Sequence, residues 1–326
     1  MSLVAKCKKF WYNNNMSTIQ YGFVFPGQGV QAVGMGQDLA KSFPVARAVF
    51  EEVDTALGYP LSKLMFAGDI TELTQTQHAQ PAIMAVSMAI VRIIESEVAP
   101  VMQLAGAVAG HSLGEYTALC AAGVLNLTDT AKLLKLRGEL MTEAAREQPG
   151  GMLALLGANI SQAMDLAKRS GCYVANDNCD GQVVLSGSHV ALTTAKMLAE
   201  TMHIKRSVPL AVAGPFHSPM MAGAAQKMFD VLNKIQFSLP QIPIFFNATG
   251  LLENKTIAFA DLLKRQMTDT VHWRETIQNM VHVDAFVECG QGTVLTGLIH
   301  RIRPDMTVLN GCDVSGVQSL ISSLKM

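Results

Sequence analysis

The chain has 326 residues, of which 49% are hydrophobic and 16% are charged, a balance typical of a compact protein with a large buried core. Its 25 lysines and arginines nearly equal its 26 aspartates and glutamates, so the composition provides no basic field for nucleic acid. The longest apolar stretch, residues 81–94, is interrupted by Ser87 and Arg92, and no run of 18 apolar residues occurs. We therefore expect a globular protein of enzyme size with neither a nucleic-acid nor a membrane partner.

The six cysteines are scattered along the chain, with no C-x-x-C pair and no Cys/His cluster at metal-ligand spacing. We therefore expect no metal site, and free thiols in a reducing compartment, the cytoplasm. Cys120 falls in a helix-forming stretch, where a free cysteine usually behaves as a small buried hydrophobe.

Residues 1–16 form a basic extension in which Lys6, Lys8 and Lys9 lie beside aromatic residues and asparagines. The extension lacks the apolar core of a secretory signal and the arginines of a mitochondrial presequence. We expect it to be disordered, and Met16 offers an alternative start.

The first predicted strand, residues 21–25, ends in a loop of turn formers, Pro26-Gly27-Gln28-Gly29. The loop does not match a nucleotide-binding loop, because the third glycine of G-x-G-x-x-G would fall at Ala32 and no Gly-Lys-Ser/Thr follows. Helices are predicted next, over 40–57 and 80–94.

A candidate nucleophile elbow follows an apolar strand predicted over 104–109. The stretch Gly110-His111-Ser112-Leu113-Gly114 matches G-x-S-x-G and leads into a helix-forming segment, 117–122. The two glycines leave room for a sharp turn that exposes the Ser112 hydroxyl, while the next backbone N–H faces the oxygen that becomes negative. The pattern alone is weak evidence, so the remaining sequence must decide whether Ser112 is a nucleophile.

The pattern changes after residue 149 to strand, helix, two strands, helix and strand, over 152–156, 161–170, 173–176, 183–186, 189–202 and 204–210. This βαββαβ order is that of a ferredoxin-like unit. We therefore predict an α/β fold in which a small domain over 148–213 is inserted into a large α/β domain made of residues 17–147 and 214–326. The second half of the large domain is predicted to contain a helix to about 235, a strand over 242–247, helices through 263 and over 273–280, a strand over 286–288 and a helix over 294–302.

An activated serine needs a base, and near neutral pH the base is usually histidine. Of the eight histidines, His111 adjoins Ser112 and at an elbow points away from it, and six others lie on or beside helical stretches. His217 instead lies in a proline-bracketed loop, 214–219, at the return from the inserted domain, where it can form the wall of a cleft. We predict His217 as the base, and its alternative role is that of a turn histidine.

Two further polar residues have no chemical role on the sequence pattern alone. Arg137 lies on a helix predicted from residue 129 that also bears Lys132 and Lys135, so we expect it on the solvated surface. Gln28 is interpreted in the same way, as an ordinary loop residue.

Six motifs resemble, in content and order, those of malonyl-CoA:acyl carrier protein transacylases. They are Phe25-Pro26-Gly27-Gln28-Gly29, Gly110-His111-Ser112-Leu113-Gly114-Glu115-Tyr116, Arg137-Gly138-Glu139-Leu140-Met141, Gly181-Gln182-Val183-Val184, Gly214-Pro215-Phe216-His217-Ser218 and Leu295-Thr296-Gly297-Leu298-Ile299. The resemblance runs from about Gln20 to the C-terminus, and it is specific as a set. It implies an α/β-hydrolase-like large domain with a parallel sheet and an inserted ferredoxin-like domain, in agreement with the division above.

The resemblance also implies roles for individual residues. Ser112 would be the nucleophile, His217 the base and Arg137 the clamp on the malonyl carboxylate. The backbone N–H groups of Gln28 and Leu113 would form the oxyanion hole.

Two more positions are assigned by the resemblance. The main-chain carbonyl of Gln266 would orient the histidine in place of a triad carboxylate, and Phe216 matches the malonyl-selective form of its motif. Thr270 stands where the family's Gln-x-x-x-Pro-Val-x-Trp has proline, which removes one source of rigidity from that loop.

The activity implied by the resemblance is ping-pong transfer of malonyl from malonyl-CoA to the phosphopantetheine thiol of an acyl carrier protein, for fatty-acid elongation. No metal or redox cofactor is implied, and we expect a monomer. The alternatives are a trans-acting acyltransferase of polyketide synthesis and a serine acyl hydrolase or thioesterase, whose acidic partner would be sought at Asp177 or Asp180. A catalytically silent carrier-docking module is disfavoured by the intact Ser112 and His217.

Overall fold

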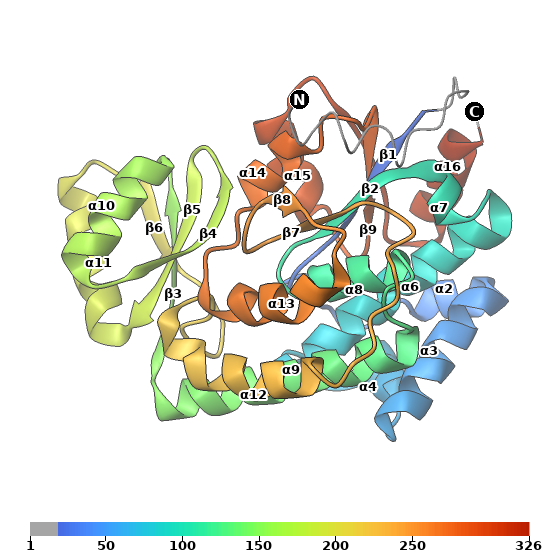
Figure 1. Ribbon diagram of the computed structural model, residues 1–326, viewed down its shortest axis with the longest axis horizontal. Helices are drawn as coiled ribbons and strands as arrows, with labels where there is room; N and C mark the ends of the chain where they lie inside the picture. The colour runs from blue at the N-terminus through green and yellow to red at the C-terminus, as the bar shows by residue number, and fades with distance from the viewer. Residues whose placement is uncertain (1–18, 326) are drawn as a thin grey trace.

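The computed structural model describes residues 19–325 of the chain. It places a mostly parallel sheet with its helices beside a smaller antiparallel sheet, which lies at the left in Figure 1. The basic extension predicted over 1–16 lies outside the described residues. The α/β class is confirmed.

Within residues 19–325 the larger sheet has six strands in the order β10-β9-β1-β2-β7-β8. All neighbours pair in parallel except β7 and β8, which are antiparallel. The strands are β1 (Tyr21–Phe25), β2 (Ala105–Gly110), β7 (Ile244–Phe246), β8 (Leu251–Leu252), β9 (Ala285–Cys289) and β10 (Thr307–Gly311). Since the carboxyl ends of parallel strands share one edge, the loops after β1, β2 and β7 meet there.

Helices cover both faces of this sheet. Phe23 and Phe25 of β1 join the core formed with α3 (Pro44–Leu57), α6 (Thr76–Glu97), α8 (Gly114–Ala121) and α9 (Leu127–Glu147). Val24 points to the opposite core, formed with α14 (Trp273–Asn279) and α15 (Val294–Ile302). With both faces covered, β1 and β2 are buried throughout, which explains their continuous apolar sequences.

Helix α6 is long and apolar enough to cross a membrane by length and composition, but 83% of its apolar window is buried inside the fold. It packs against α3, α8 and α9. At its crossing with α9, a Cβ added to Gly138 would lie 2.5 Å from the Cα of Gln77. The two backbones are therefore in direct contact beside Arg137.

The smaller sheet is formed by β3 (Gly150–Leu156), β4 (Tyr173–Cys179), β5 (Gln182–Ser188) and β6 (Arg206–Pro209), in the order β4-β5-β3-β6 with antiparallel neighbours. Helices α10 (Ile160–Ser170) and α11 (His189–Thr201) pack against this sheet and share an apolar core with it. Backbone hydrogen bonds join β4 to the larger part: Val271 N–H donates to Ala175 and Asp177 N–H donates to Val271. The cavity described below lies beside this junction.

The remaining elements are α2 (Gln37–Ser42), α4 (Leu61–Ala67), α5 (Ile70–Leu73), α7 (Val101–Leu104), η1 (Pro219–Met221), α12 (Ala222–Leu232), η2 (Thr256–Ala258), α13 (Phe259–Thr268) and α16 (Val314–Leu324). The single helix predicted over 40–57 is wrong. Phe43 has extended angles (φ −126°, ψ 113°) because Pro44 follows it, so the chain forms α2 and then α3. Strands β8 and β10 and helix α16 were not predicted.

The contact between α6 and α9 gives a stability prediction. Gly138→Ala inserts a methyl group between two backbones and should lower the free energy of unfolding by about 1–3 kcal/mol. Gly297→Ala is the control, since Gly297 is exposed on α15 and its added Cβ meets nothing within 4 Å, so it should stabilise the protein by about 0.5–1 kcal/mol. Urea unfolding measures both changes. A Gly138→Ala protein as stable as its parent would contradict the close contact.

Candidate active site

The predicted elbow forms a strand–turn–helix unit at the carboxyl edge of the larger sheet. β2 ends at Gly110 and α8 begins at Gly114, and Ser112 between them has a left-handed φ of +53°. A Cβ on Gly110 would lie 1.9 Å from the backbone of Gly114, so the tight turn requires glycine there. The turn exposes the Ser112 side chain to a cavity.

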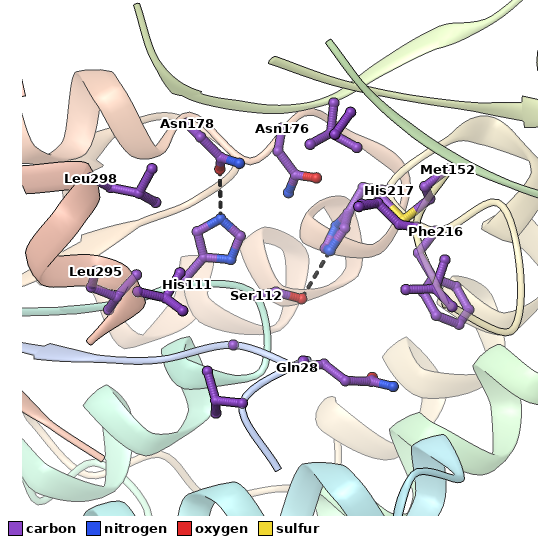
Figure 2. Close-up of a pocket in the computed structure, with 18 of the residues that line it drawn as sticks. Gln28, His111, Ser112, Met152, Asn176, Asn178, Phe216, His217, Leu295 and Leu298 are labelled. Carbon is purple, nitrogen blue, oxygen red and sulfur yellow. Dashed lines mark hydrogen bonds between the residues drawn. The ribbon is translucent and has the colours of Figure 1, made fainter. Parts of the chain in front are cut away.

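The Ser112 hydroxyl meets His217, as predicted from the sequence. Ser112 Oγ lies 2.8 Å from His217 Nε2, and Figure 2 shows the two side chains pointing toward one another. His217 Nδ1 lies 2.7 Å from the backbone carbonyl oxygen of Gln266, which only accepts, so Nδ1 carries the proton. Nε2 therefore has a free lone pair directed at the serine hydroxyl and can accept its proton.

Arg137 is 1% exposed, so the interpretation of its helix pattern alone, as a solvated surface arginine, is wrong. Its Nη2 donates to Ser112 Oγ (3.1 Å) and to Gln266 Oε1 (2.8 Å). Its position on the face of α9 that packs against α6 directs it inward, because Gly138 lets the helices approach closely. The guanidinium thus lies beside the candidate nucleophile.

Two glutamines hold this guanidinium. Gln80 Oε1 on α6 accepts from Arg137 Nη1 at 2.9 Å, and the Gln266 side chain, besides its contact with Arg137, donates to the Ser112 carbonyl at 2.7 Å. Gln80 was not predicted as a site residue, although a glutamine at the start of the long apolar run was a usable signal. Both glutamines are buried.

Burial sets the charge state of the histidine. Burial first, and then the positive charge of Arg137, lower the pKa of His217 to about 3, although the hydrogen bond to the Gln266 carbonyl acts in the opposite direction. The imidazole is therefore neutral at physiological pH and able to act as a base.

Two backbone N–H groups predicted for the oxyanion hole are free. Within residues 19–325, neither the Gln28 N–H nor the Leu113 N–H donates a hydrogen bond to the protein. The Ser112 N–H, by contrast, donates to Asn247 Oδ1 at 2.7 Å. Figure 2 shows Gln28 on the opposite side of Ser112 from the small sheet.

A cavity of about 280 Å³ opens over Ser112 between the two sheets. Its floor includes Gln28, Gln80 and Arg137, and its walls include Phe216 and His217. The small sheet and α15 contribute Met152, Ala154, Asn176, Asn178, Val184, Leu295 and Leu298. A mostly apolar cavity with convergent polar groups is typical of a small-molecule site.

His111 points away from the nucleophile, as expected. Its Nε2 donates to Asn178 Oδ1 at 2.8 Å, and its ring packs against Trp273 with centroids 5.5 Å apart. His111 therefore links the elbow to the small sheet.

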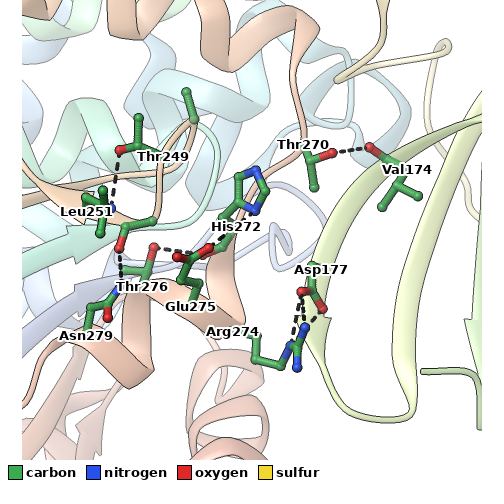
Figure 3. Close-up of polar contacts among 12 residues, drawn as sticks. Val174, Asp177, Thr249, Leu251, Thr270, His272, Arg274, Glu275, Thr276 and Asn279 are labelled. Carbon is green, nitrogen blue, oxygen red and sulfur yellow. Dashed lines mark hydrogen bonds and ion pairs between the residues drawn. The ribbon is translucent and has the colours of Figure 1, made fainter. Parts of the chain in front are cut away.

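Neither aspartate considered as a triad partner reaches the histidine. Asp177 forms a two-point ion pair with Arg274 at 2.7–3.1 Å, and Asp180 contacts the same arginine at 3.3 Å. Figure 3 shows the Asp177 pair. Because the Nδ1 of His217 is bonded to the Gln266 carbonyl, the site lacks the carboxylate–histidine contact of a serine hydrolase triad.

The loop that carries Thr270 is fixed by hydrogen bonds where the family pattern has proline. Thr270 Oγ1 donates to the Val174 carbonyl at 2.6 Å, as Figure 3 shows, and Val271 forms backbone bonds with β4. Asp269 before it is extended (φ −101°, ψ 167°), the conformation favoured before proline. The Thr270 side-chain hydrogen bond thus restrains the loop in place of a proline ring.

Within residues 19–325, no group of three or more His, Cys, Asp or Glu side chains is placed to hold a metal ion. The five described cysteines are free, and Cys7 lies outside the described residues. Burial raises the pKa of Cys120 to about 11, in keeping with its interpretation as a small buried hydrophobe.

Comparison with known proteins decides the family. A model of the acyl transferase domain matches residues 22–305. The chain belongs to the acyl transferase domain family. It is 37% identical to the malonyl CoA-acyl carrier protein transacylase of Bacillus subtilis (strain 168), over 93% of this chain and 96% of that protein. It is 39% identical to the protein of that name in Escherichia coli (strain K12), over 88% of this chain and 94% of that protein.

Solved structures of this acyl transferase family agree. The acyl-carrier-protein-S-malonyltransferase of Bartonella henselae superposes with a TM-score of 0.91 at 41% identity, covering 94% of this chain and 100% of that one. A malonyl-transacylase solved in complex with a type II PKS acyl-carrier protein gives 0.89 at 36% identity, covering 93% and 99%. The resemblance inferred from the motifs is confirmed.

The neutral imidazole gives a pH prediction. Because the pKa of His217 is lowered to about 3, the rate at which Ser112 is acylated should not fall through protonation of the base between pH 7.5 and pH 5.5. A rapid-quench measurement of single-turnover acylation checks this, with circular dichroism as the control for folding at each pH. An acid limb near the ordinary histidine pKa of about 6.5 would contradict it.

Proposed function

We propose that the chain transfers malonyl from malonyl-CoA to the phosphopantetheine thiol of an acyl carrier protein, through a malonyl ester on Ser112. The observation that carries the proposal is the buried guanidinium of Arg137, 3.1 Å from the same Ser112 Oγ that His217 contacts. One hydroxyl is thus placed beside both a base and a cation that pairs with a carboxylate. The relatives named above carry the same activity in their names.

The first half-reaction starts when Ser112 Oγ attacks the thioester carbonyl and His217 Nε2 takes its proton. The carbonyl oxygen, now negative, is stabilised by the N–H groups of Gln28 and Leu113, each contributing about 3 kcal/mol. The intermediate collapses, the C–S bond breaks, and His217 returns the proton to the departing CoA sulfur. In the second half-reaction the carrier thiol gives its proton to His217 and attacks the ester, and Ser112 recovers the proton as it leaves.

Selectivity for malonyl rests on the buried charge. The guanidinium of Arg137 can pair with the malonyl carboxylate at two points, whereas an acetyl group leaves it without an anionic partner in a desolvated site. Gln80 and Gln266 hold its orientation. Phe216, 4% exposed in the cavity wall next to the base, narrows the acyl site and favours malonyl.

We also infer that residues 148–213 form an inserted ferredoxin-like domain within a hydrolase-like large domain, residues 17–147 and 214–326. The element order β3-α10-β4-β5-α11-β6 and the strand order β4-β5-β3-β6 support this, because they match the βαββαβ unit. The cavity then lies between the two domains, a common position for a substrate site.

The pathway proposed is fatty-acid elongation in the cytoplasm. The free cysteines within residues 19–325 favour a reducing compartment, and no cofactor beyond the two acyl carriers is needed for the chemistry described. Supply of malonyl to a polyketide carrier is the second candidate, favoured by the likeness to the transacylase solved with a type II PKS acyl-carrier protein. A serine hydrolase is disfavoured, because Asp177 and Asp180 are bonded to Arg274.

Labelling tests the covalent intermediate. Brief incubation with radiolabelled malonyl-CoA should place one malonyl group on the peptide that contains Ser112, and holo-acyl carrier protein should then remove it, because the ester is an intermediate. Mass spectrometry locates the adduct, and Ser112→Ala is the control that should abolish it. Label found on a cysteine, or release to water at the same rate with and without the carrier protein, would rule out the transferase.

Selectivity tests the role of Arg137. Arg137→Ala removes a charge-assisted contact of about 1.5–3 kcal/mol that acetyl cannot make, so the malonyl/acetyl ratio of kcat/KM should fall at least about tenfold. Arg137→Lys restores charge without the planar fork and should recover part of the ratio. Steady-state kinetics with both thioesters gives the values. An unchanged malonyl/acetyl ratio in Arg137→Ala would show that the arginine does not bind the malonyl carboxylate.

A further inference from the structure

The side chain of Asn247 spans the base of the elbow. Asn247 follows directly after β7 and is fully buried. Its Oδ1 accepts from the Ser112 N–H at 2.7 Å, and its Nδ2 donates to the Gly110 carbonyl at 2.7 Å. One amide therefore bonds the backbone on both sides of the sharp turn, from a segment more than a hundred residues away in sequence.

Asn247 is itself held by Glu115, on the first turn of the elbow helix. The Asn247 N–H donates to Glu115 Oε2 at 2.5 Å, and Glu115 is 0% exposed. The Asn247 carbonyl accepts from the His272 N–H at 2.9 Å. Both backbone polar groups of Asn247 are thus bonded, so its side chain is presented to the elbow in one orientation.

The elbow needs such support because its backbone is strained. Ser112 has φ +53°, a left-handed conformation that a serine rarely adopts and that persists only where surrounding contacts impose it. When Asn247 accepts the Ser112 N–H, that donor is directed away from the cavity, while the next N–H, of Leu113, stays free. The contact holds the backbone of the residue whose Oγ lies 2.8 Å from His217 Nε2.

We propose that Asn247 is a positioning residue for Ser112, held in place by Glu115, and that this pair sets the rate at which the serine is acylated. In its malonyl form the inference rests on the proposed function. Asn247 and Glu115 lie beneath the elbow and do not line the cavity, so neither residue would contact the acyl group or CoA.

Glu115 acts in this pair as a hydrogen-bond acceptor. The groups that face it are Asn247, Arg137 and Gln266, together with its neighbour Tyr116. Burial raises the pKa of Glu115 to about 8, against the opposing effects of the Asn247 bond, the Arg137 charge and a side-chain bond with Gln266. A glutamine has the same shape and keeps an oxygen for the Asn247 N–H, so it should replace the glutamate.

The first test compares two asparagines. Asn247→Ala should reduce the single-turnover acylation rate about 100-fold, the order expected for a misplaced reacting group, while the KM for malonyl-CoA stays within about threefold. Asn279→Ala is the matched control. The Asn279 Nδ2 also donates to a backbone carbonyl, that of Gly250, which lies in the loop after β7 and away from the serine. Figure 3 shows Asn279 near Leu251. Its acylation rate should equal that of the parent.

The second test uses Glu115 and stays informative if Asn247→Ala does not fold. Glu115→Gln should keep acylation within about threefold of the parent, whereas Glu115→Ala should lose it to the same extent as Asn247→Ala. Thermal unfolding of each variant separates stability from rate. Normal acylation in a folded Asn247→Ala or Glu115→Ala protein overturns the proposal, as does an equal loss in Glu115→Gln and Glu115→Ala.

A fluorophosphonate probe separates this proposal from the proposed function. The probe phosphonylates activated serines and displaces fluoride, and it needs no malonyl group. If the parent protein reacts at Ser112 while malonyl-CoA does not, the malonyl assignment fails but the positioning proposal can still be measured. Labelling of Asn247→Ala should be slowed about as much as its acylation, and equal labelling of parent and variant contradicts the positioning role.

Discussion

The burial of one positive charge, that of Arg137, constrains the rest of this site. A guanidinium at 1% exposure loses most of its hydration, and within residues 19–325 no carboxylate forms an ion pair with it. Its charge is instead met by the oxygens of Gln80, Gln266 and Ser112 and by the ring of Tyr116, 5.8 Å from the guanidinium carbon. Within residues 19–325 these neutral partners bond Nη1 and Nη2, leave the buried Nε without a hydrogen-bond partner, and do not neutralise the charge. Under the proposed function, the carboxylate of the malonyl group is the anion that pairs with this charge.

Gln266 couples this charge to the catalytic chemistry. Its carbonyl accepts from His217 Nδ1, its side-chain oxygen accepts from Arg137, and its side-chain nitrogen donates to the Ser112 carbonyl. The proposed base, clamp and nucleophile are therefore all bonded to a single residue, which is at 0% exposure. A backbone carbonyl orients the imidazole as a triad carboxylate would, but it adds no second charge beside Arg137. The neutral acceptor thus leaves the cation available to the substrate.

The sequence predicted those features that depend on local pattern. Ser112 follows a buried strand and is flanked by two glycines, and His217 lies in a proline-bracketed loop, so the meeting of these two side chains could be predicted. Arg137 was misplaced by residue type alone, because the pattern around it contains lysines and the burial comes from Gly138 meeting α6. Asn247 left no local signal, since its role depends on β7 pairing beside β2. Contacts set by sheet order and helix crossing cannot be inferred from the spacing of residues along one segment.

At the junction of the two sheets, successive side chains of β4 point in opposite directions and make different contacts. On β4, Asn176 and Asn178 face the cavity, whereas Asp177 between them points away and pairs with Arg274 of α14. Asn178 also accepts from His111, the neighbour of the nucleophile. Polar contacts are directional, so this interface fixes the position of the cavity wall relative to Ser112 more narrowly than apolar packing of the same area. Register shifts on β4, between residues 174 and 176 and between 177 and 179, accommodate this arrangement, because a bulge changes the direction of the side chains that follow it. The cavity over Ser112 is therefore lined by one strand of the small sheet as well as by the elbow that carries the serine.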